Sequence, residues 1–92
     1  MSEGLLQLFV DGEWKYVCDD VFDNDLNGAF VACREMGFRE GTAIKSSVPN
    51  DIFADNIKCS GTEYSLADCG RSSSENCKTT DGIYLTCTGK RF

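Results

Sequence analysis

Six cysteines are spread through a chain of 92 residues that contains no histidine. A domain this short buries only about 60–65% of the surface that its unfolded chain exposes, so its hydrophobic core alone gives little stability. An even number of well-separated cysteines in such a chain predicts a framework of disulfides, formed in an oxidising compartment. We therefore expect three disulfides among Cys18, Cys33, Cys59, Cys69, Cys77 and Cys87.

Zinc binding is the alternative use of such cysteines. Structural zinc sites favour closely spaced pairs such as C-x2-C. Successive cysteines in this chain are separated by 15, 26, 10, 8 and 10 positions, so no such pair occurs. The spacing favours disulfides over zinc, but it does not say which cysteine pairs with which.

The charge of the chain restricts its partners. Fifteen acidic residues against nine basic ones give a formal net charge of −6. This charge disfavours non-specific binding to nucleic acids or to anionic membranes, and no apolar run is long enough to span a bilayer. The first residues also lack the basic and apolar regions of a signal peptide. We therefore expect a mature segment or a single module of a larger extracellular protein, either secreted or the ectodomain of a membrane protein.

A β-hairpin is predicted near the start of the chain. Residues 5–10 form a short apolar run, and Asp11-Gly12 is a dipeptide that favours a type I′ turn. Large apolar side chains then recur at positions 14, 16 and 18, with the period of two that is typical of a strand. We assign a purely structural role to Trp14 and Tyr16.

One amphipathic helix is predicted over residues 26–36. Apolar residues recur at a spacing of three or four positions, as on one face of a helix: Leu26, Ala29, Phe30, Cys33 and Met36. Asp25 or Asn27 can cap its start, and Gly37 follows where a glycine commonly ends a helix. We expect Phe30 and Met36 to pack in the core.

The other segments are short. We expect an acidic loop over residues 19–25 and a long loop over residues 39–50, with one short strand in it as the alternative. A strand is predicted over residues 52–59, a single helical turn within residues 63–68, and a final strand over residues 82–88. Residues 70–76 are predicted to form a polar loop.

Several segments in order resemble the scavenger receptor cysteine-rich (SRCR) domain. The family pattern GxWGTVCDDxW is similar to residues 12–20, which are GEWKYVCDD, and VVCRxLGF is similar to residues 31–38, which are VACREMGF. Further matches lie at residues 52–63, 66–69 and 76–87. The resemblance covers about residues 4–89, which we take as a single SRCR-like domain between an N-terminal tail (1–3) and a C-terminal tail (90–92).

The resemblance implies an α+β fold in which a curved, mainly antiparallel β-sheet cradles one α-helix. It also implies the pairings Cys18–Cys77, Cys33–Cys87 and Cys59–Cys69. Phe38 stands where the eight-cysteine group of the family has a further cysteine, so the chain is similar to the six-cysteine group. The chain departs from the pattern at several tryptophan positions; Phe53, for example, replaces one of them.

Two cation sites follow from the resemblance, for Ca²⁺ or Mg²⁺. The first corresponds to Asp19, Asp20 and Asp81, and the second to Asp55, Glu63 and Asn76. Hard cations prefer such carboxylate and amide oxygens. If Cys18 pairs with Cys77, Asp19, Asp20 and Asp81 must converge, and three carboxylates in one small region repel one another unless a cation lies between them. In the alternative, these carboxylates only cap turns.

The predicted function is that of a non-catalytic extracellular ligand-binding module. A cation with few protein ligands would bridge the acidic face to an anionic, glycan or protein ligand on a cell or microbial surface. We expect no enzymatic activity, because the chain offers no histidine, no free thiol and no nucleophile with a partner base. We expect no binding to nucleic acid and no direct membrane insertion. The alternative is a small disulfide-rich toxin, inhibitor or structural protein that acts through metal-independent protein contacts.

Overall fold

The computed structural model describes residues 2–23, 25–54, 56–72 and 77–90. Its elements, in chain order, are β1 (Ser2–Leu5), β2 (Gln7–Val10), β3 (Glu13–Tyr16), α1 (Asp19–Phe22), α2 (Asn27–Glu35), β4 (Phe38–Ser46), β5 (Asn56–Lys58), the 3₁₀ helix η1 (Leu66–Asp68), β6 (Gly70–Ser72) and β7 (Gly82–Lys90). No helix in the described part of the chain has the length and apolarity needed to cross a bilayer.

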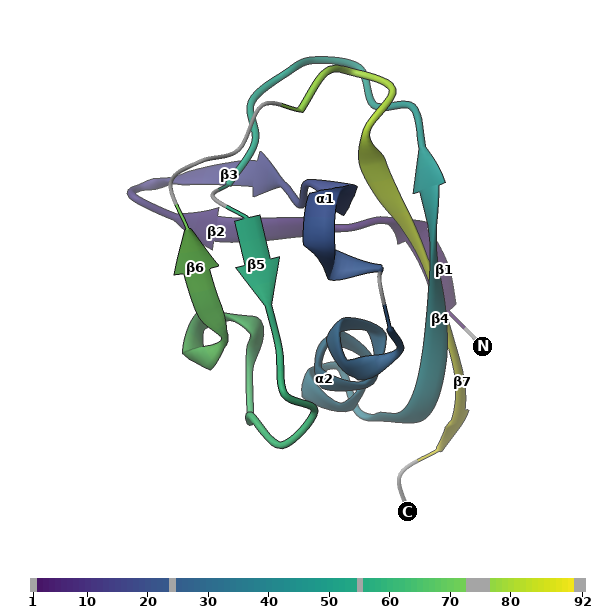
Figure 1. Cartoon of the computed structure of the whole chain (residues 1–92). Coiled ribbons are helices and arrows are strands. Elements are labelled where there is room, and N and C mark those ends of the chain that lie inside the picture. Colours follow the sequence, from purple (N-terminus) through teal and green to yellow (C-terminus); the bar gives the residue numbers. More distant parts are fainter. Residues whose placement is uncertain (1, 24, 55, 73–76, 91–92) are drawn as a thin grey trace.

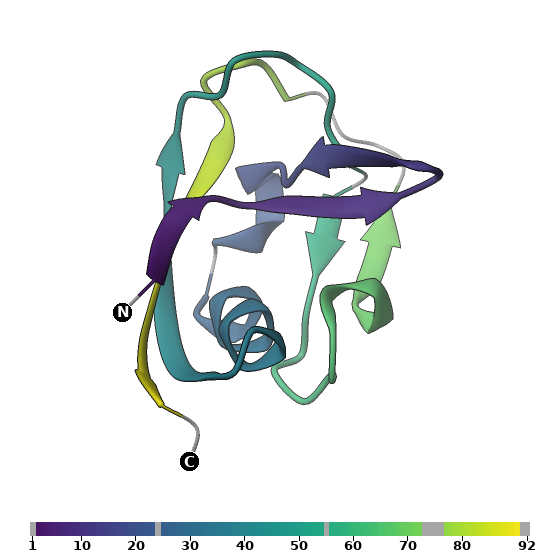
Figure 2. The same ribbon diagram turned by 180° about the vertical axis from the view of Figure 1, so that it is seen from behind.

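The strands form three small antiparallel sheets around the longer helix. The main sheet has the order β1-β7-β4, so the last strand of the chain lies between the first strand and β4. The pairs β2–β3 and β5–β6 make two further ribbons. Figures 1 and 2 show α2 enclosed between the main sheet and the β5–η1 side. This arrangement confirms the predicted α+β class, with antiparallel strands cradling one helix.

The predicted hairpin and helix are both present. Asp11 and Gly12 have φ values of 55° and 81°, the positive values that a type I′ turn requires at both central residues. The Asp25 Oδ1 atom accepts a hydrogen bond from the Asn27 N–H at 2.9 Å, at the first turn of α2. Gly37, with φ of 91°, ends the helix and donates its N–H to the Arg34 carbonyl.

Three segments predicted as loops contain regular structure. Residues 39–50 begin inside β4, the acidic segment 19–25 begins with α1, and the polar segment 70–76 begins with β6. The two strands depend on pairing with another strand, because β4 pairs with β7 and β6 pairs with β5. Local residue preferences do not report such pairing.

Strand β1 also starts earlier than expected. Ser2 and Glu3 lie opposite Cys87 and Thr86, inside the segment that we assigned to an N-terminal tail. At the other end, β7 continues to Lys90, the first residue of the expected C-terminal tail.

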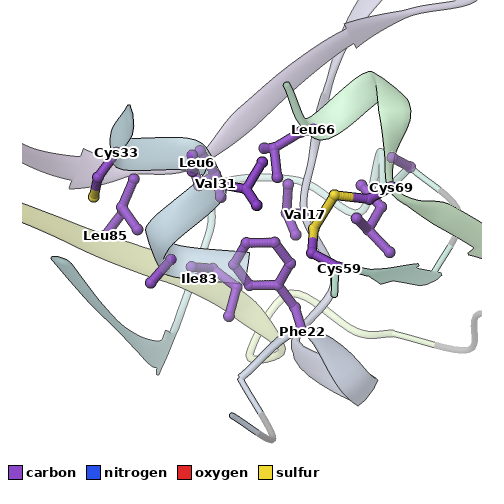
Figure 3. Packing of buried hydrophobic residues seen from close by; sticks show 14 of the residues in the cluster. Leu6, Val17, Phe22, Val31, Cys33, Cys59, Leu66, Cys69, Ile83 and Leu85 are labelled. Atoms are coloured by element: carbon purple, nitrogen blue, oxygen red, sulfur yellow. A yellow bond between two sulfur atoms is a disulfide. The ribbon is translucent and has the colours of Figure 1, made fainter. Parts of the chain in front are cut away.

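The core lies between α2, the main sheet and the β5 ribbon. Phe22 and Val31 lie close to Val17 and Ile83 in this core (Figure 3), and Ile57 belongs to the same cluster; all five are almost fully buried. These side chains come from α1, α2, the segment after β3, β5 and β7, so the core joins all parts of the fold. Among the described residues, Asn56 is the one buried polar side chain.

Several large apolar residues in the described part of the chain lie outside this core. Leu26, on the predicted apolar face of the helix, is 51% exposed, and Phe30, which was expected in the core, is only half-buried and is not part of the core cluster. Met36 follows the last turn of α2 and is 51% exposed, so the prediction that it packs in the core is wrong.

Trp14 is 61% exposed and packs edge-to-face against Phe9, with ring centroids 5.3 Å apart. Leu8 and Val10, on the other face of the β2–β3 ribbon, pack against the core. Tyr16, on the same face as Trp14, is buried in a second cluster with Cys18, Val48 and Phe53.

The three disulfides implied by the resemblance are all confirmed. Cys33–Cys87 joins α2 to β7, Cys18–Cys77 joins the end of the hairpin to the segment before β7, and Cys59–Cys69 closes the loop between β5 and β6. Their Cα–Cα distances, in this order, are 5.4, 6.0 and 4.7 Å, within the range for disulfides. Every cysteine of the chain is therefore cross-linked.

Candidate cation site

Asp19 and Asp81 lie side by side although 62 positions separate them in the sequence. Asp19 is the first residue of α1, directly after Cys18, and Asp81 precedes β7. The Cys18–Cys77 disulfide joins their two segments, and the Asp19 N–H donates a hydrogen bond to the Asp81 carbonyl at 2.9 Å. The structure thus brings together two of the three residues predicted for the first cation site.

A tight turn fixes the carboxylate of Asp81. Its Oδ2 atom accepts a hydrogen bond from the Lys78 N–H at 2.8 Å, and the Asp81 N–H donates back to the Lys78 carbonyl at 2.8 Å. The turn occupies one carboxylate oxygen and leaves Oδ1 for a second partner. Asp81 is therefore both a turn residue, as in the alternative considered above, and an oriented acceptor.

That second partner is Lys45 on β4. Its ammonium nitrogen lies 3.0 Å from Asp81 Oδ1 and 3.9 Å from Asp19 Oδ2. The two carboxylate side chains are 22% and 15% exposed, respectively, whereas the lysine side chain is 58% exposed. A cationic group therefore lies between the two predicted ligands, with its stem in solvent.

The electrostatics agree with this geometry. The backbone N–H of Lys78 and then the Lys45 ammonium lower the pKa of Asp81 below its ordinary value. The hydrogen bond to Asp81 and the negative charges of Asp81, Asp19 and Asp23 raise the pKa of Lys45. The Asp81 carboxylate and the Lys45 ammonium are therefore both charged at neutral pH.

The donor atoms fit a hard cation. Asp19 and Asp81 present carboxylate oxygens, which are the ligands that hard cations prefer. The Lys45 ammonium lies between these carboxylates and interacts with the same oxygens. Asp20 follows Asp19 in α1, but its side chain lies outside the described part of the chain. Sequence reasoning missed Lys45, because the strand that places it was predicted as a loop.

The second predicted site is described only at Glu63. Asp55 and Asn76 lie outside the described residues. The Glu63 carboxylate accepts the Ser60 N–H on both oxygens, at 3.1 and 2.9 Å, and also accepts the Gly61 N–H and the Ser60 hydroxyl, each at 3.1 Å. These donors, led by the Ser60 N–H, lower the pKa of Glu63. Glu63 therefore has a turn-stabilising role of its own.

This role predicts a pH-dependent stability difference for Glu63→Gln. A lowered folded-state pKa means that the carboxylate stabilises the fold above its unfolded value, 4.5, and that this contribution is lost as the pH falls through the folded value. We expect Glu63→Gln to melt at a lower temperature than wild type at pH 7, with the difference shrinking toward pH 3. Thermal unfolding followed by circular dichroism at a series of pH values measures it. Glu40→Gln, at an exposed position of β4, is the control for charge loss; an equal effect there would contradict the assignment.

Comparisons with known proteins place the chain in a family. Residues 1–88 match the model of the scavenger receptor cysteine-rich domain. Human lysyl oxidase homolog 2 is 35% identical over 99% of the chain, and mouse macrophage receptor MARCO is 35% identical over 95% of it. The chain spans only 12% and 17% of the lengths of these two proteins.

Two solved structures share the fold. The SRCR domain of mouse MARCO, in its dimeric form, superimposes with a TM-score of 0.80 at 35% identity, over 95% of this chain and 87% of that one. The third SRCR domain of murine neurotrypsin gives a TM-score of 0.79 at 32% identity, over 92% and 84% of the two chains. The chain therefore belongs to the scavenger receptor cysteine-rich family, whose domains are non-catalytic ligand-binding modules of extracellular and receptor proteins.

Proposed function

We propose that this domain binds anionic ligands through a divalent cation, Ca²⁺ or Mg²⁺, held by Asp19, Asp20 and Asp81. The observation that supports the proposal most strongly is the convergence of the Asp19 and Asp81 carboxylates on one positive charge, the Lys45 ammonium. The hydrogen-bonded turn orients Asp81 before any cation arrives. Asp55, Glu63 and Asn76 are proposed as a second, neighbouring set of ligands.

The charge of the chain explains why a cation is needed. A domain with a net charge of −6 repels phosphate, sulfate and carboxylate groups. A bound Ca²⁺ ion would supply positive charge and open coordination positions for such groups. Asp19 and Asp81 would hold it at the edge of the domain, where their side chains are partly exposed. Sites with few protein ligands bind calcium at about 10⁻⁴–10⁻³ M, as extracellular modules do.

The proposed ligands are therefore anionic groups of glycans or proteins on a cell or microbial surface. The domain would act as one module of a larger secreted or membrane-anchored protein. The pairing of a rigid disulfide framework with an exposed acidic site supports this role, because the framework fixes the ligand atoms without a large core.

The first test is a calcium titration of the ¹⁵N-labelled domain, followed by NMR. We expect saturable shifts of the backbone amides of residues 19, 20 and 81, with a dissociation constant of about 10⁻⁴–10⁻³ M. The double substitution Asp19→Asn and Asp81→Asn should abolish saturation, because it removes both charged acceptors. Glu13→Gln with Glu40→Gln removes the same charge elsewhere and should leave the titration unchanged.

Ligand binding gives the second readout. Dextran sulfate should bind wild type in the presence of calcium and lose binding on addition of EDTA, whereas uncharged dextran should not bind. The cation-bridging function would be refuted by the absence of saturable shifts at millimolar calcium. Binding of dextran sulfate that is insensitive to EDTA would instead indicate metal-independent contacts.

A further inference from the structure

Lys45 occupies the position that the proposed function gives to the metal. Its ammonium contacts Asp81 at 3.0 Å and lies 3.9 Å from Asp19, and these are the two described residues of the proposed site. Calcium–oxygen distances are about 2.3–2.6 Å, so a calcium ion bound to the same two carboxylates would fall within the space that the ammonium fills. The lysine and the ion therefore exclude each other sterically and also repel each other electrostatically.

We propose that Lys45 is a tethered counter-ion that competes with the divalent cation for Asp19 and Asp81, and that this competition sets the cation concentration at which the site is filled. The inference rests on the proposed function and adds its regulation. At low cation concentration the ammonium neutralises the two carboxylates. At high concentration the divalent ion, with twice the charge, replaces it.

The structure makes this exchange feasible. The Lys45 side chain is 58% exposed, and such exposed ion pairs contribute little to stability, so the ammonium can leave without disturbing the fold. Its backbone stays fixed, because Lys45 lies opposite Ile83 in the β4–β7 pair. The carboxylates also stay in place, since Asp81 is held by the Lys78 N–H and the Asp19 backbone by the Asp81 carbonyl. Only the lysine side chain has to move.

The charged groups around the Lys45 ammonium all favour its position between the two carboxylates. Asp19, Asp81 and Asp23 each act on it with a negative charge. Lys78 contacts Asp81 through its backbone N–H, and its positive charge has a smaller effect on Asp81 than Lys45 has. Lys45 is therefore the side chain whose removal should change cation affinity most directly.

The test compares three variants in the same calcium titration. Lys45→Met keeps an unbranched stem and deletes the charge. In wild type, calcium can bind only the fraction of molecules in which the ammonium has left the two carboxylates, and the apparent affinity for calcium is lower in proportion to this fraction. We therefore expect the calcium dissociation constant of Lys45→Met to be about tenfold lower than that of wild type. Lys45→Arg keeps the charge and should stay within about twofold of wild type.

The matched control is Lys15→Met. Lys15 also pairs with two carboxylates, Asp11 at 3.4 Å and Glu13 at 4.0 Å, but it lies on the hairpin. This substitution changes the net charge by the same amount, so it measures the general attraction of calcium to a more acidic domain. The amide shifts of residues 19 and 81 report binding, and the Lys45 ε-CH₂ resonance in wild type should move toward that of a free lysine as calcium is added.

The outcomes separate the inference from the proposed function. If wild type binds calcium and Lys45→Met binds no more tightly than Lys15→Met, the competition is refuted and the cation site stands. If Lys45→Met binds but wild type does not bind at millimolar calcium, the competition stands and the cation-bridging function of the natural chain is refuted. If neither binds, both are wrong.

Discussion

Replacing Cys33 and Cys87 together with alanine is expected to lower the free energy of unfolding by about 4 kcal/mol. The two residues are separated by 54 positions, and cross-linking a long loop removes much of the conformational entropy of the unfolded chain. Both residues are also buried, at 0% and 1% exposure, so removal of their sulfur atoms leaves unfilled space between α2 and β7. Because small domains have little stability in reserve, we expect a large unfolded fraction at 37 °C.

Urea unfolding followed by circular dichroism measures this effect. The control is Cys59→Ala with Cys69→Ala, which opens a loop with a sequence separation of only 10. The loop-entropy argument gives about 3 kcal/mol for this shorter loop, so the loss should be smaller. A larger loss for Cys59–Cys69 than for Cys33–Cys87 would show that local strain or packing, and not loop length, governs the stabilisation.

Gly41→Ala is expected to destabilise the domain by about 1–3 kcal/mol. Gly41 lies on β4 opposite Cys87, where the strand passes the Cys33–Cys87 disulfide. A methyl group there would overlap the Cys33 sulfur and lie 2.5 Å from the Thr86 carbonyl oxygen. Neither neighbour can move freely, because one is in a disulfide and the other is backbone. The substitution should push β4 away from β7 near the middle of their pairing.

Thermal unfolding and amide hydrogen exchange of β7 test this prediction. Gly70→Ala is the matched control, because Gly70 is also a strand glycine and its nearest neighbour, the Lys58 carbonyl oxygen, would lie at an ordinary contact distance of 3.5 Å. We expect that variant to stay within about 0.5 kcal/mol of wild type. Equal destabilisation by the two substitutions would contradict the packing argument.

The predicted elements that were correct have strong local signals. The Asp11-Gly12 turn is stabilised by residues that adopt positive φ, and α2 has apolar residues at helical spacing and a terminal glycine. The face that α2 buries differs from the predicted one, because it contains Val31 and Ala32 in place of Leu26, Phe30 and Met36. The pairings of the six cysteines came from the resemblance, since composition and spacing left them open. They are present as expected.

The errors fall on elements that depend on distant partners. Strand β4 contains Gly41 and several charged residues, a composition that local preferences place in a loop. It is a strand because β7 pairs with it along most of its length and α2 packs on it. The exposure of Trp14 and Met36 also depends on tertiary contacts. Periodicity places each residue on an apolar face, but the packing of the hairpin and of the helix end decides which apolar residues are covered.

The candidate site also contains residues that the sequence identified and one that only the structure revealed. Asp19 and Asp81 were identified from the sequence, and the Cys18–Cys77 disulfide brings them together as the resemblance implied. The sequence does not indicate that Lys45 joins this site, since nothing near it in the sequence connects it to either carboxylate. The register of β4 against β7 places its ammonium between them.

By itself, the sequence determined the disulfide-dependent class of the domain, its hairpin and its longer helix, and its resemblance to a family supplied the acidic residues of the candidate site. These features depend on residue types and short spacings, which act locally. The tertiary structure alone decided which strands pair, which apolar residues are covered and which cation lies between Asp19 and Asp81. Those features depend on contacts between segments far apart in the chain, and such contacts form only when the whole core and its cross-links are in place.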